Sequence, residues 1–220
     1  AQVQGIGSNL ITVMPGSFQQ AGQGSRQATL YYSDYEALVK TVKDVVGIAP
    51  AFQASASIKF EDETKSTTII ATTAEYGRLR NYKAALGRFP NPAEEANGAR
   101  VAVLGSQTAE DLFGGLNPVG RQIKINNITF SVVGVLAHKP LIGSTDGTHI
   151  WDRKVIVPET TFDLTYAPEH RADRILLQAS DSATAPELPL ETLRKSVVSA
   201  LRARHAGADN FELDDASARA

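Results

Sequence analysis

The sequence predicts an α+β fold in two lobes, and three features of the 220-residue chain support this class. Short apolar runs typical of strands alternate with stretches whose apolar residues have helical spacing. A strand–helix–strand pattern occurs at each end of the chain, over residues 9–60 and 174–214. The middle, roughly 75–171, has strands and helices of its own. One lobe is therefore expected to be interrupted by a second, inserted lobe.

Apolar runs bounded by turn residues define the first elements. Residues 55–60 alternate between apolar and polar, as a half-buried strand does, and the charged turn 61–65 makes the next run its hairpin partner. Helical spacing from Tyr35 to Val46 predicts a helix. In chain order we expect a strand over 9–14 that ends at Pro15-Gly16, a flexible polar loop over 17–29, a helix that begins at the caps Ser33 or Asp34 and ends at Gly47, and a hairpin of strands 48–60 and 66–73.

The middle of the chain alternates between buried-type strands and short helices. The two neighbouring asparagines Asn126-Asn127 separate two strictly alternating runs, which is a strong hairpin signal. In chain order we expect a helix over 74–86 that ends at Gly87, a polar connection over 89–98, a strand over 100–104, a helix capped by Ser106, a hairpin of strands 122–126 and 128–136, an irregular segment over 139–153, a strand over 154–157 and a short helix over 160–164.

The last part contains a strand over 174–179, an amphipathic helix over 190–205 and a strand over 210–213. If the strand–helix–strand patterns at both ends share one sheet, the arrangement is a split β-α-β unit of the ferredoxin-like kind. In that fold the first and last strands are antiparallel neighbours, so Ala1 and Ala220 would leave from the same end. We expect one discontinuous lobe of residues 1–74 plus 172–220, and an inserted α/β lobe of residues 75–171.

Composition excludes several classes of function. With 42% hydrophobic and 21% charged residues, the chain is neither disordered nor collagen-like. A net charge of −2 gives no general attraction to nucleic acid, so no nucleic-acid partner is expected. The absence of cysteine excludes disulfides, iron–sulfur clusters, thiolate zinc sites and cysteine nucleophiles.

No run approaches the ~20 apolar residues that span a bilayer. Residues 1–7 are short, polar and uncharged, unlike a signal peptide, and the chain lacks an initiator Met. Ala1 and Ala220 are therefore expected to be the edges of a piece of a longer protein.

Motifs for phosphate binding and nucleophilic catalysis are missing. No G-x-x-x-x-G-K-[ST] segment occurs, and the strand–Gly–helix stretch around Gly105 lacks the two further glycines of a dinucleotide site. Ser106 is not in a G-x-S-x-G nucleophile elbow. We therefore expect no cofactor in this chain, no ATP or Mg²⁺ site, and no catalytic residue.

Histidines and acidic pairs do not form a site by their spacing. The histidines show no i, i+4 pairing and no H-E-x-x-H arrangement, so no metal site is expected. His205 is expected at a helix end, where a cationic imidazole favours the dipole. The acidic pairs lie in expected exposed turns, where adjacent side chains point apart.

Trp151 and Arg153 are the candidate partner-binding residues. Trp151 is the single tryptophan of the chain and lies in the irregular segment next to Asp152 and Arg153. Exposed Trp and Arg are favoured at interface hot spots, so this pair is a candidate interaction anchor. The alternative is that Trp151 packs at a hinge between the lobes.

A series of motifs resembles a known family. It comprises Ala85-Leu-Gly-Arg-Phe89, Arg100-Val-Ala-Val-Leu-Gly-Ser106, Ala109-Glu-Asp-Leu-Phe-Gly-Gly115, Asn117-Pro-Val-Gly120, Gln122-Ile-Lys-Ile125 and Phe130-Ser-Val-Val-Gly-Val-Leu136. Together these resemble the extracytoplasmic core domain of MacB-type ABC transporter permeases, in the wider group of FtsX-like permeases. The segment 139–153 departs from the Gly- and Gln-rich loop expected there.

The resemblance implies a periplasmic domain between two transmembrane helices of a permease, at the bacterial inner membrane. It implies a porter-like lobe and a smaller α/β lobe. Implied partners are the flanking transmembrane helices, a second permease subunit, an ATPase domain or subunit that binds ATP and Mg²⁺ in the cytoplasm, and an adaptor protein in the periplasm. ATP hydrolysis would move the outer domains mechanically and so act on cargo in the periplasm.

Two other classes of function remain open at the level of sequence. A soluble enzyme would place His138, His149 or Asp152 as acid–base groups in a cleft between the lobes, because long irregular segments often have functional roles. A freestanding periplasmic binding protein would need its own start signal and no flanking membrane helices.

Overall fold

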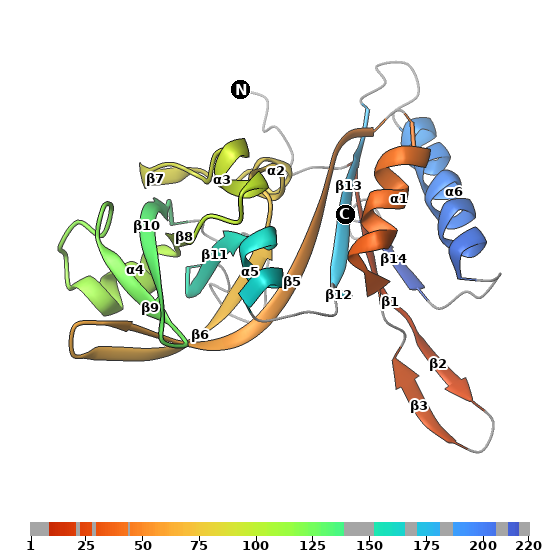
Figure 1. Cartoon of the computed structure of the whole chain (residues 1–220). Coiled ribbons are helices and arrows are strands. Elements are labelled where there is room, and N and C mark those ends of the chain that lie inside the picture. Colours follow the sequence, from red (N-terminus) through yellow and green to blue (C-terminus); the bar gives the residue numbers. More distant parts are fainter. Residues whose placement is uncertain are drawn as a thin grey trace. The chain divides into compact units, whose positions relative to one another are not determined.

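The computed structural model describes residues 9–20, 23–27, 30–43, 45–138, 152–165, 171–180, 187–205 and 211–215. The chain forms two compact units, one of Ala1–Ala51 with Glu169–Ala220 and the other of Phe52–Pro168. The first boundary falls inside the long strand β5 (Val45–Phe60). Figure 1 labels the elements along the chain.

The first unit contains a four-stranded antiparallel sheet in the order β14-β1-β13-β5. Its elements are β1 (Leu10–Pro15), α1 (Tyr32–Thr41), the first part of β5, β13 (Arg174–Ala179), α6 (Glu187–Arg204) and β14 (Phe211–Asp215). Strands β1 and β5 run parallel on either side of β13, and β13 and β14 run parallel on either side of β1. Two split β-α-β units therefore interleave, which confirms the predicted ferredoxin-like topology.

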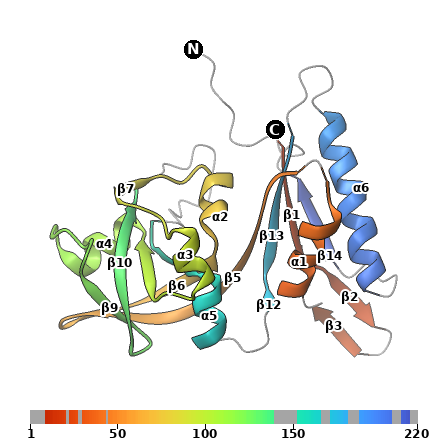
Figure 2. The ribbon, with the colours of Figure 1, turned by 45° about the horizontal axis from the view of Figure 1, so that its top comes forward.

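Both helices of this unit pack on the same face of the sheet (Figure 2). Alternate residues of the strands point toward the helices, and apolar residues three and four apart on each helix meet them. The buried side chains of this core include Ile11, Val13, Leu38, Ile175, Leu177, Leu193, Val197 and Leu201. The helical and strand periodicities of the sequence thus account for this layer.

The first and last strands are antiparallel neighbours, as predicted. Ile11 lies opposite Asp215, and Pro15 lies opposite Phe211. The start of β1 and the end of β14 therefore lie side by side at one end of the sheet. Ala1 and Ala220 themselves lie outside the described residues.

The prediction of a flexible loop over 17–29 was wrong. β2 (Ser17–Gln20) and β3 (Gln23–Gln27) form an antiparallel hairpin there, and β4 (Leu30–Tyr31) pairs with β12 (Arg171–Ala172). Backbone hydrogen bonds hold a two-stranded ribbon whatever the polarity of its side chains. A search for apolar alternation therefore does not find it.

The first helix is shorter than the sequence predicts. It ends at Thr41, and β5 begins at Val45, so Gly47 is inside a strand and opposite Gln178 rather than after a helix. The β-branched residues Val42, Val45 and Val46 fit a pleated strand better than a helix. Tyr31 is the N-cap in place of Ser33 or Asp34.

The second unit is a mixed sheet that closes on itself. The strand order is β5-β6-β11-β8-β10, and β9 pairs with both β10 and β5, so the ring is complete. Strand β7 pairs with the end of β10 beyond β9. The strands are β6 (Glu63–Thr72), β7 (Ala84–Gly87), β8 (Val101–Leu104), β9 (Gln122–Ile125), β10 (Ile128–Leu136) and β11 (Lys154–Pro158).

Side chains from alternate positions of these strands fill the ring. They include Ile58, Ile69, Ala102, Leu104, Ile123, Ile125, Phe130, Val155 and Val157. Four short helices accompany the strands: α2 (Ala74–Leu79), α3 (Pro92–Ala96), α4 (Ser106–Phe113) and α5 (Glu159–Thr165). Both asparagines of the β9–β10 turn have positive φ, at 45° for Asn126 and 68° for Asn127. The predicted hairpin is therefore confirmed with its turn chemistry.

Two elements of this unit differ from the sequence prediction. The helix expected over 74–86 ends at Leu79, and residues 84–87 form strand β7. The expected polar connection over 89–98 contains α3. No described helix has the length and hydropathy of a membrane span.

The unit boundaries differ from the expected 74/75 and 171/172 divisions: residues 169–171 belong to the first unit, and residues 52–74 belong to the second. This stretch holds the rest of β5 and all of β6. Strand β6 pairs with β11, and side chains of β5 and β6 fill the ring of the second unit. The pairing partners, rather than the position of the hairpin along the chain, place the stretch in that unit.

Candidate functional site

The paired strands β1 and β14 form the base of the first unit. Strand β1 pairs on both sides, with β13 and with β14, and its side chains Ile11 and Val13 are buried against the helices. The neighbouring positions Thr12 and Asp214 lie opposite each other on the other face of the sheet. The two segments that enter and leave the unit are thus hydrogen-bonded to one another along their described length.

A buried carboxylate ties together the two helices that pack on this sheet. The Asp34 side chain is 3% exposed, and its Oδ1 accepts a hydrogen bond from Arg204 Nε at 2.8 Å. His205 Nε2 lies 3.3 Å from the same oxygen. Oδ2 accepts the backbone N–H of Tyr31 at 3.0 Å, and Arg204 Nη2 donates to Ser33 Oγ at 3.0 Å. A buried carboxylate needs such partners, so these bonds fix the end of α6 to the start of α1.

His205 also contacts the last strand. Its ring meets the Phe211 ring edge to face, with the centroids 6.1 Å apart. His205 comes directly after Arg204, the last residue of α6, so the predicted helix-end position is confirmed. The imidazole therefore lies between the Asp34 carboxylate and the first residue of β14.

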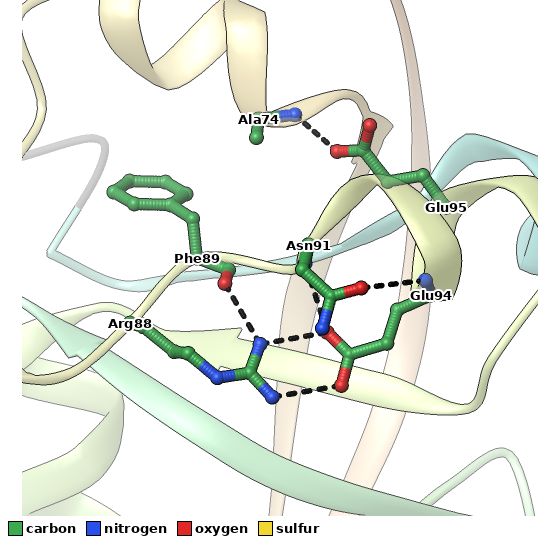
Figure 3. Close-up of polar contacts among 6 residues, drawn as sticks. All are labelled: Ala74, Arg88, Phe89, Asn91, Glu94 and Glu95. Carbon is green, nitrogen blue, oxygen red and sulfur yellow. Dashed lines mark hydrogen bonds and ion pairs between the residues drawn. The ribbon is translucent and has the colours of Figure 1, made fainter.

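In the second unit, α3 begins with a capping box and a two-bond ion pair (Figure 3). Asn91 Oδ1 accepts the N–H of Glu94, and Glu94 Oε2 accepts the N–H of Asn91, both at 2.9 Å. Arg88 donates to both oxygens of Glu94, at 2.7 and 2.8 Å. The Arg88 guanidinium lowers the pKa of Glu94 to about 2. Together these contacts hold the Arg88–Glu94 stretch in one geometry.

Glu95 links α3 to two other helices. Its Oε1 accepts the backbone N–H of Ala74, the first residue of α2, and its carbonyl accepts the hydroxyl of Thr160 in α5 (Figure 3 shows the first contact). Partial burial raises the pKa of the Glu95 carboxyl. Thr161 adds a bond from its hydroxyl to the carbonyl of Ala99 at 2.7 Å. Helix α3 therefore connects α2 and α5.

Two of the three residues proposed for an acid–base role lie together. His138 Nδ1 is 2.5 Å from Asp152 Oδ2. The His138 side chain is 57% exposed, whereas Asp152 is 6% exposed. The carbonyl of Asp152 accepts the N–H of Thr108 at 3.0 Å, in the first turn of α4. His149 lies outside the described residues, and within the described part no group of three His, Cys, Asp or Glu could hold a metal ion.

Of the two candidate partner-binding residues, Trp151 and Arg153, the structure describes only Arg153. Trp151 lies outside the described residues. Arg153 is exposed, and its carbonyl accepts the hydroxyl of Thr67 at 2.5 Å. The anchor role of this pair stays a prediction.

The strand–Gly–helix stretch is a turn whose amide groups bond to the chain itself. Gly105 is the N-cap of α4, and its N–H donates to the carbonyl of Lys154 at 2.8 Å. Ser106 is the first residue of the helix rather than its cap. The predicted helix is confirmed, and its cap is one residue earlier than expected.

Sequence reasoning missed the Asp34 cluster and the α3 contacts. The pattern Asn91-Pro92 followed by Glu94 is a capping-box signature with Pro at the first helical position, so α3 had a readable signal. The contact of Asp34 with Arg204 joins residues 170 positions apart, and no local sequence pattern predicts it.

Comparisons with known proteins agree on one family. The sequence profile of the MacB-like periplasmic core domain matches residues 1–189. The macrolide export ATP-binding/permease protein MacB of Azoarcus sp. strain BH72 is 33% identical over 212 residues, which are 96% of this chain and 31% of that protein. The pyoverdine export ATP-binding/permease protein PvdT of Pseudomonas entomophila is 26% identical over 219 residues, 99% of this chain and 32% of that protein. The chain thus spans about a third of these relatives.

Solved structures share the fold. The periplasmic region of MacB from Actinobacillus actinomycetemcomitans superposes with a TM-score of 0.79 at 20% identity, over 99% of this chain and 93% of that one. The extracellular domain of the ABC-type transporter YknZ from Gram-positive bacteria gives 0.74 at 17% identity, over 94% and 100%. The predicted α+β class with a porter-like lobe and an inserted α/β lobe is therefore confirmed. From the extent of the profile match, this chain belongs to the MacB-like periplasmic core domain family.

Proposed function

We propose that this chain is the outer domain of an ABC transporter permease, and that it converts ATP-driven movement of membrane helices into movement of periplasmic cargo or of an adaptor protein. The observation that carries this proposal is the pairing of β1 with β14, with Ile11 opposite Asp215. Segments that flank the domain on both sides would act on one edge of one sheet.

The packing of the first unit supports a role in which its sheet and helices move together as a rigid body when force is applied. A displacement of β14 reaches α6 through the His205–Phe211 contact and reaches α1 through Asp34. Close-packed cores transmit strain because they have little free volume. A load applied at the base would therefore move the sheet and both helices together.

Under this proposal, the membrane-spanning and ATP-hydrolysing functions of the transporter belong to other domains or subunits. The domain would lie on the periplasmic face of the bacterial inner membrane, between two transmembrane helices and next to a second permease subunit. A cytoplasmic ATPase domain or subunit would bind ATP and Mg²⁺, so this domain would need no cofactor and would perform no catalysis. A periplasmic adaptor would be its partner outside the membrane, and the relatives named for export of macrolides and pyoverdine favour an efflux role over lipoprotein release.

The proposal is tested on the full-length transporter in lipid nanodiscs. A spin label on exposed Lys124, introduced as Lys124→Cys, reports the distance between the two copies. We expect the distance distribution to change when ATP is added, and to stay unchanged in a variant with an inactive ATPase. If the distance distribution did not change on addition of ATP to an active transporter, the proposal would be contradicted.

The His138–Asp152 pair favours the alternative of a soluble enzyme, because a histidine oriented by a carboxylate is a common general base. His138→Ala separates the two functions. The transporter hypothesis expects ATP-driven motion to be retained in this variant. Loss of a chemical activity of the domain, with that motion intact, would support the enzyme.

A further inference from the structure

The end of α3 contains Asn97-Gly98, the one Asn–Gly pair of the sequence, with Asn97 as the C-cap and Gly98 at φ +59°. The N–H of Gly98 donates to the carbonyl of Glu95 at 3.3 Å. The N–H of Ala99 donates to the carbonyl of Glu94 at 2.9 Å. These two bonds form a Schellman motif, in which the residue after the C-cap has a left-handed conformation. The helix end therefore favours a glycine directly after Asn97.

The side chain of Asn97 differs from those of the asparagines that the local structure holds. It is exposed and makes no hydrogen bond within the described part of the chain. Asn91 and Asn117 each accept a backbone N–H through Oδ1, and each precedes a proline, whose nitrogen has no proton. Asn126 also accepts a backbone N–H, from β5. Asn97 alone among these four combines an unbonded amide with a neighbouring nitrogen that no side chain shields.

We propose that Asn97 is a site of spontaneous deamidation, in which the main-chain nitrogen of Gly98 attacks the side chain of Asn97. The N–H of Gly98 loses its proton to water, a bond forms from this nitrogen to Cγ of Asn97, and the Cγ–Nδ2 bond breaks with release of ammonia. Water then opens the resulting succinimide ring. Addition at Cγ leaves aspartate, and addition at the main-chain carbonyl leaves isoaspartate. Asparagine is among the thermolabile residues, and glycine hinders the attack least because it has no Cβ.

The fold controls this reaction through the conformation of the turn. Asn97 has ψ 4°, so the Gly98 nitrogen eclipses the nitrogen of Asn97, whereas ring closure requires it to eclipse Cβ. Rotation to that conformation breaks both bonds of the Schellman motif. The bond from Gly98 is long at 3.3 Å, and α3 has only five residues, so its exposed end opens easily. The reaction rate therefore follows the population of chains in which this end of α3 is open.

Isoaspartate changes the connection between α3 and α5. Its main chain is one carbon longer than that of asparagine, so the N–H of Ala99 no longer reaches the carbonyl of Glu94 in the same turn. The carbonyl of Ala99 accepts the hydroxyl of Thr161 in α5 at 2.7 Å. Formation of isoaspartate at residue 97 therefore loosens α3 from α5, and this change needs no partner.

The test incubates the complete 220-residue chain in mildly alkaline buffer and follows residues 89–100, which are released by cleavage after Arg88 and Arg100. This peptide contains Asn97 and, as an internal control, Asn91. Tandem mass spectrometry should show replacement of the amide by a carboxyl group at Asn97 and not at Asn91. Asn97→Gln should prevent this change in the peptide. An unchanged Asn97, or an earlier change at another asparagine of the described residues, would overturn the proposal.

Two variants test the link to the helix end. Asn91→Ala removes the N-cap acceptor of α3 (Figure 3), so it should raise the rate at Asn97 about fivefold. Ser66→Ala, at an exposed site outside α3, should leave the rate within about twofold. Equal rates in the two variants would refute a reaction through the opened helix end. The purified isoaspartate form should unfold at a lower urea concentration than the unmodified chain, and an equal midpoint would refute the loosening of α3.

Discussion

Glu95 is a side chain whose role depends on its acceptor oxygen rather than on its charge. Its Oε1 accepts the first N–H of α2, where the N-cap Thr73 makes no side-chain cap bond. Burial raises its pKa, so ionised Glu95 lowers stability once the pH is above the pKa values of both the unfolded and folded states. The bond and the charge therefore act in opposite directions.

We predict that Glu95→Ala lowers the free energy of unfolding by about 1 kcal/mol, because Ala74 loses its acceptor. Glu95→Gln retains an acceptor oxygen without the charge, so it should match or exceed the stability of the unmodified chain at pH 7. Urea unfolding of the three proteins measures this. Equal losses in both variants would mean that the charge, and not the acceptor, stabilises α2.

The Arg88–Glu94 pair makes stability depend on pH in the opposite direction to Glu95, because ionised Glu94 stabilises the folded chain. The pKa of Glu94 is about 2 in the folded chain, below its ordinary value of 4.5. A lowered pKa adds stability that is present above pH 4.5 and is lost as the pH falls toward 2.

Arg88→Met is expected to lower the free energy of unfolding by about 0.5–1 kcal/mol at pH 7, since Arg88 is half exposed and its ion pair is partly screened. The difference from the unmodified chain should shrink between pH 4.5 and pH 2. Stability curves at several pH values measure it. A difference that stays constant down to pH 2 would show that lost packing, rather than the ion pair, is responsible.

At the scale of elements, the pairing of β7 with β10 depends on two glycines in close contact. Gly87 has φ +64°, and a Cβ on it would lie 2.1 Å from the carbonyl oxygen of Val133. A Cβ on Gly134 would lie 2.3 Å from the carbonyl oxygen of Arg88. Backbone on both sides leaves no flexible group that could move aside. Only glycine therefore fits both positions without shifting the strands.

Gly87→Ala should destabilise the second unit by about 3 kcal/mol or more, because steric overlap adds to the cost of a positive φ. Gly115→Ala is the matched control. Its φ is +88°, but an added Cβ meets nothing within 4 Å, so we expect a loss of only about 1–2 kcal/mol. Thermal unfolding compares the two, and similar losses would exclude the steric explanation.

Elements with a buried face could be predicted from the sequence. Strands β1, β8, β9, β10, β11 and β13 and helix α6 are close to their predicted positions, because burial imposes a periodicity of two or 3.6 on the residues. The β2–β3 hairpin lacks apolar alternation, and the end of α1 is set by the sheet that the following valines join. Tertiary pairing decides these cases, and local propensity does not.

The candidate site was less predictable than the fold. The pairing of β1 with β14 followed from the strand order alone, whereas the contacts of Asp34 with Arg204 and His205 join distant residues of ordinary local sequence. Such juxtapositions follow from the packed helices, because spacing along one helix does not reveal its partner.

At the scale of the whole molecule, the insertion leaves the ferredoxin-like unit intact. The second unit lies in the chain between β5 and β13, which are antiparallel neighbours in the sheet of the first unit. The ends of these two strands lie close together, so a unit inserted between them does not disturb the order β14-β1-β13-β5. The pairing of β1 with β14 is therefore unaffected by the insertion.

A disulfide across this base tests whether the domain moves as a body. Thr12 and Asp214 are opposite residues of an antiparallel pair, at a spacing compatible with a disulfide, and this chain has no cysteine of its own. The free energy of unfolding of the Thr12→Cys/Asp214→Cys variant should be about 3–5 kcal/mol higher in the oxidised form than in the reduced form, because the disulfide closes a very long loop. In the full-length transporter, the ATP-dependent change in distance between the two copies should be the same in both forms, since a domain that moves as a rigid body keeps β1 and β14 paired. If oxidation abolished the motion and reduction restored it, β1 and β14 would have to separate during the cycle, and transmission through an intact sheet would be wrong.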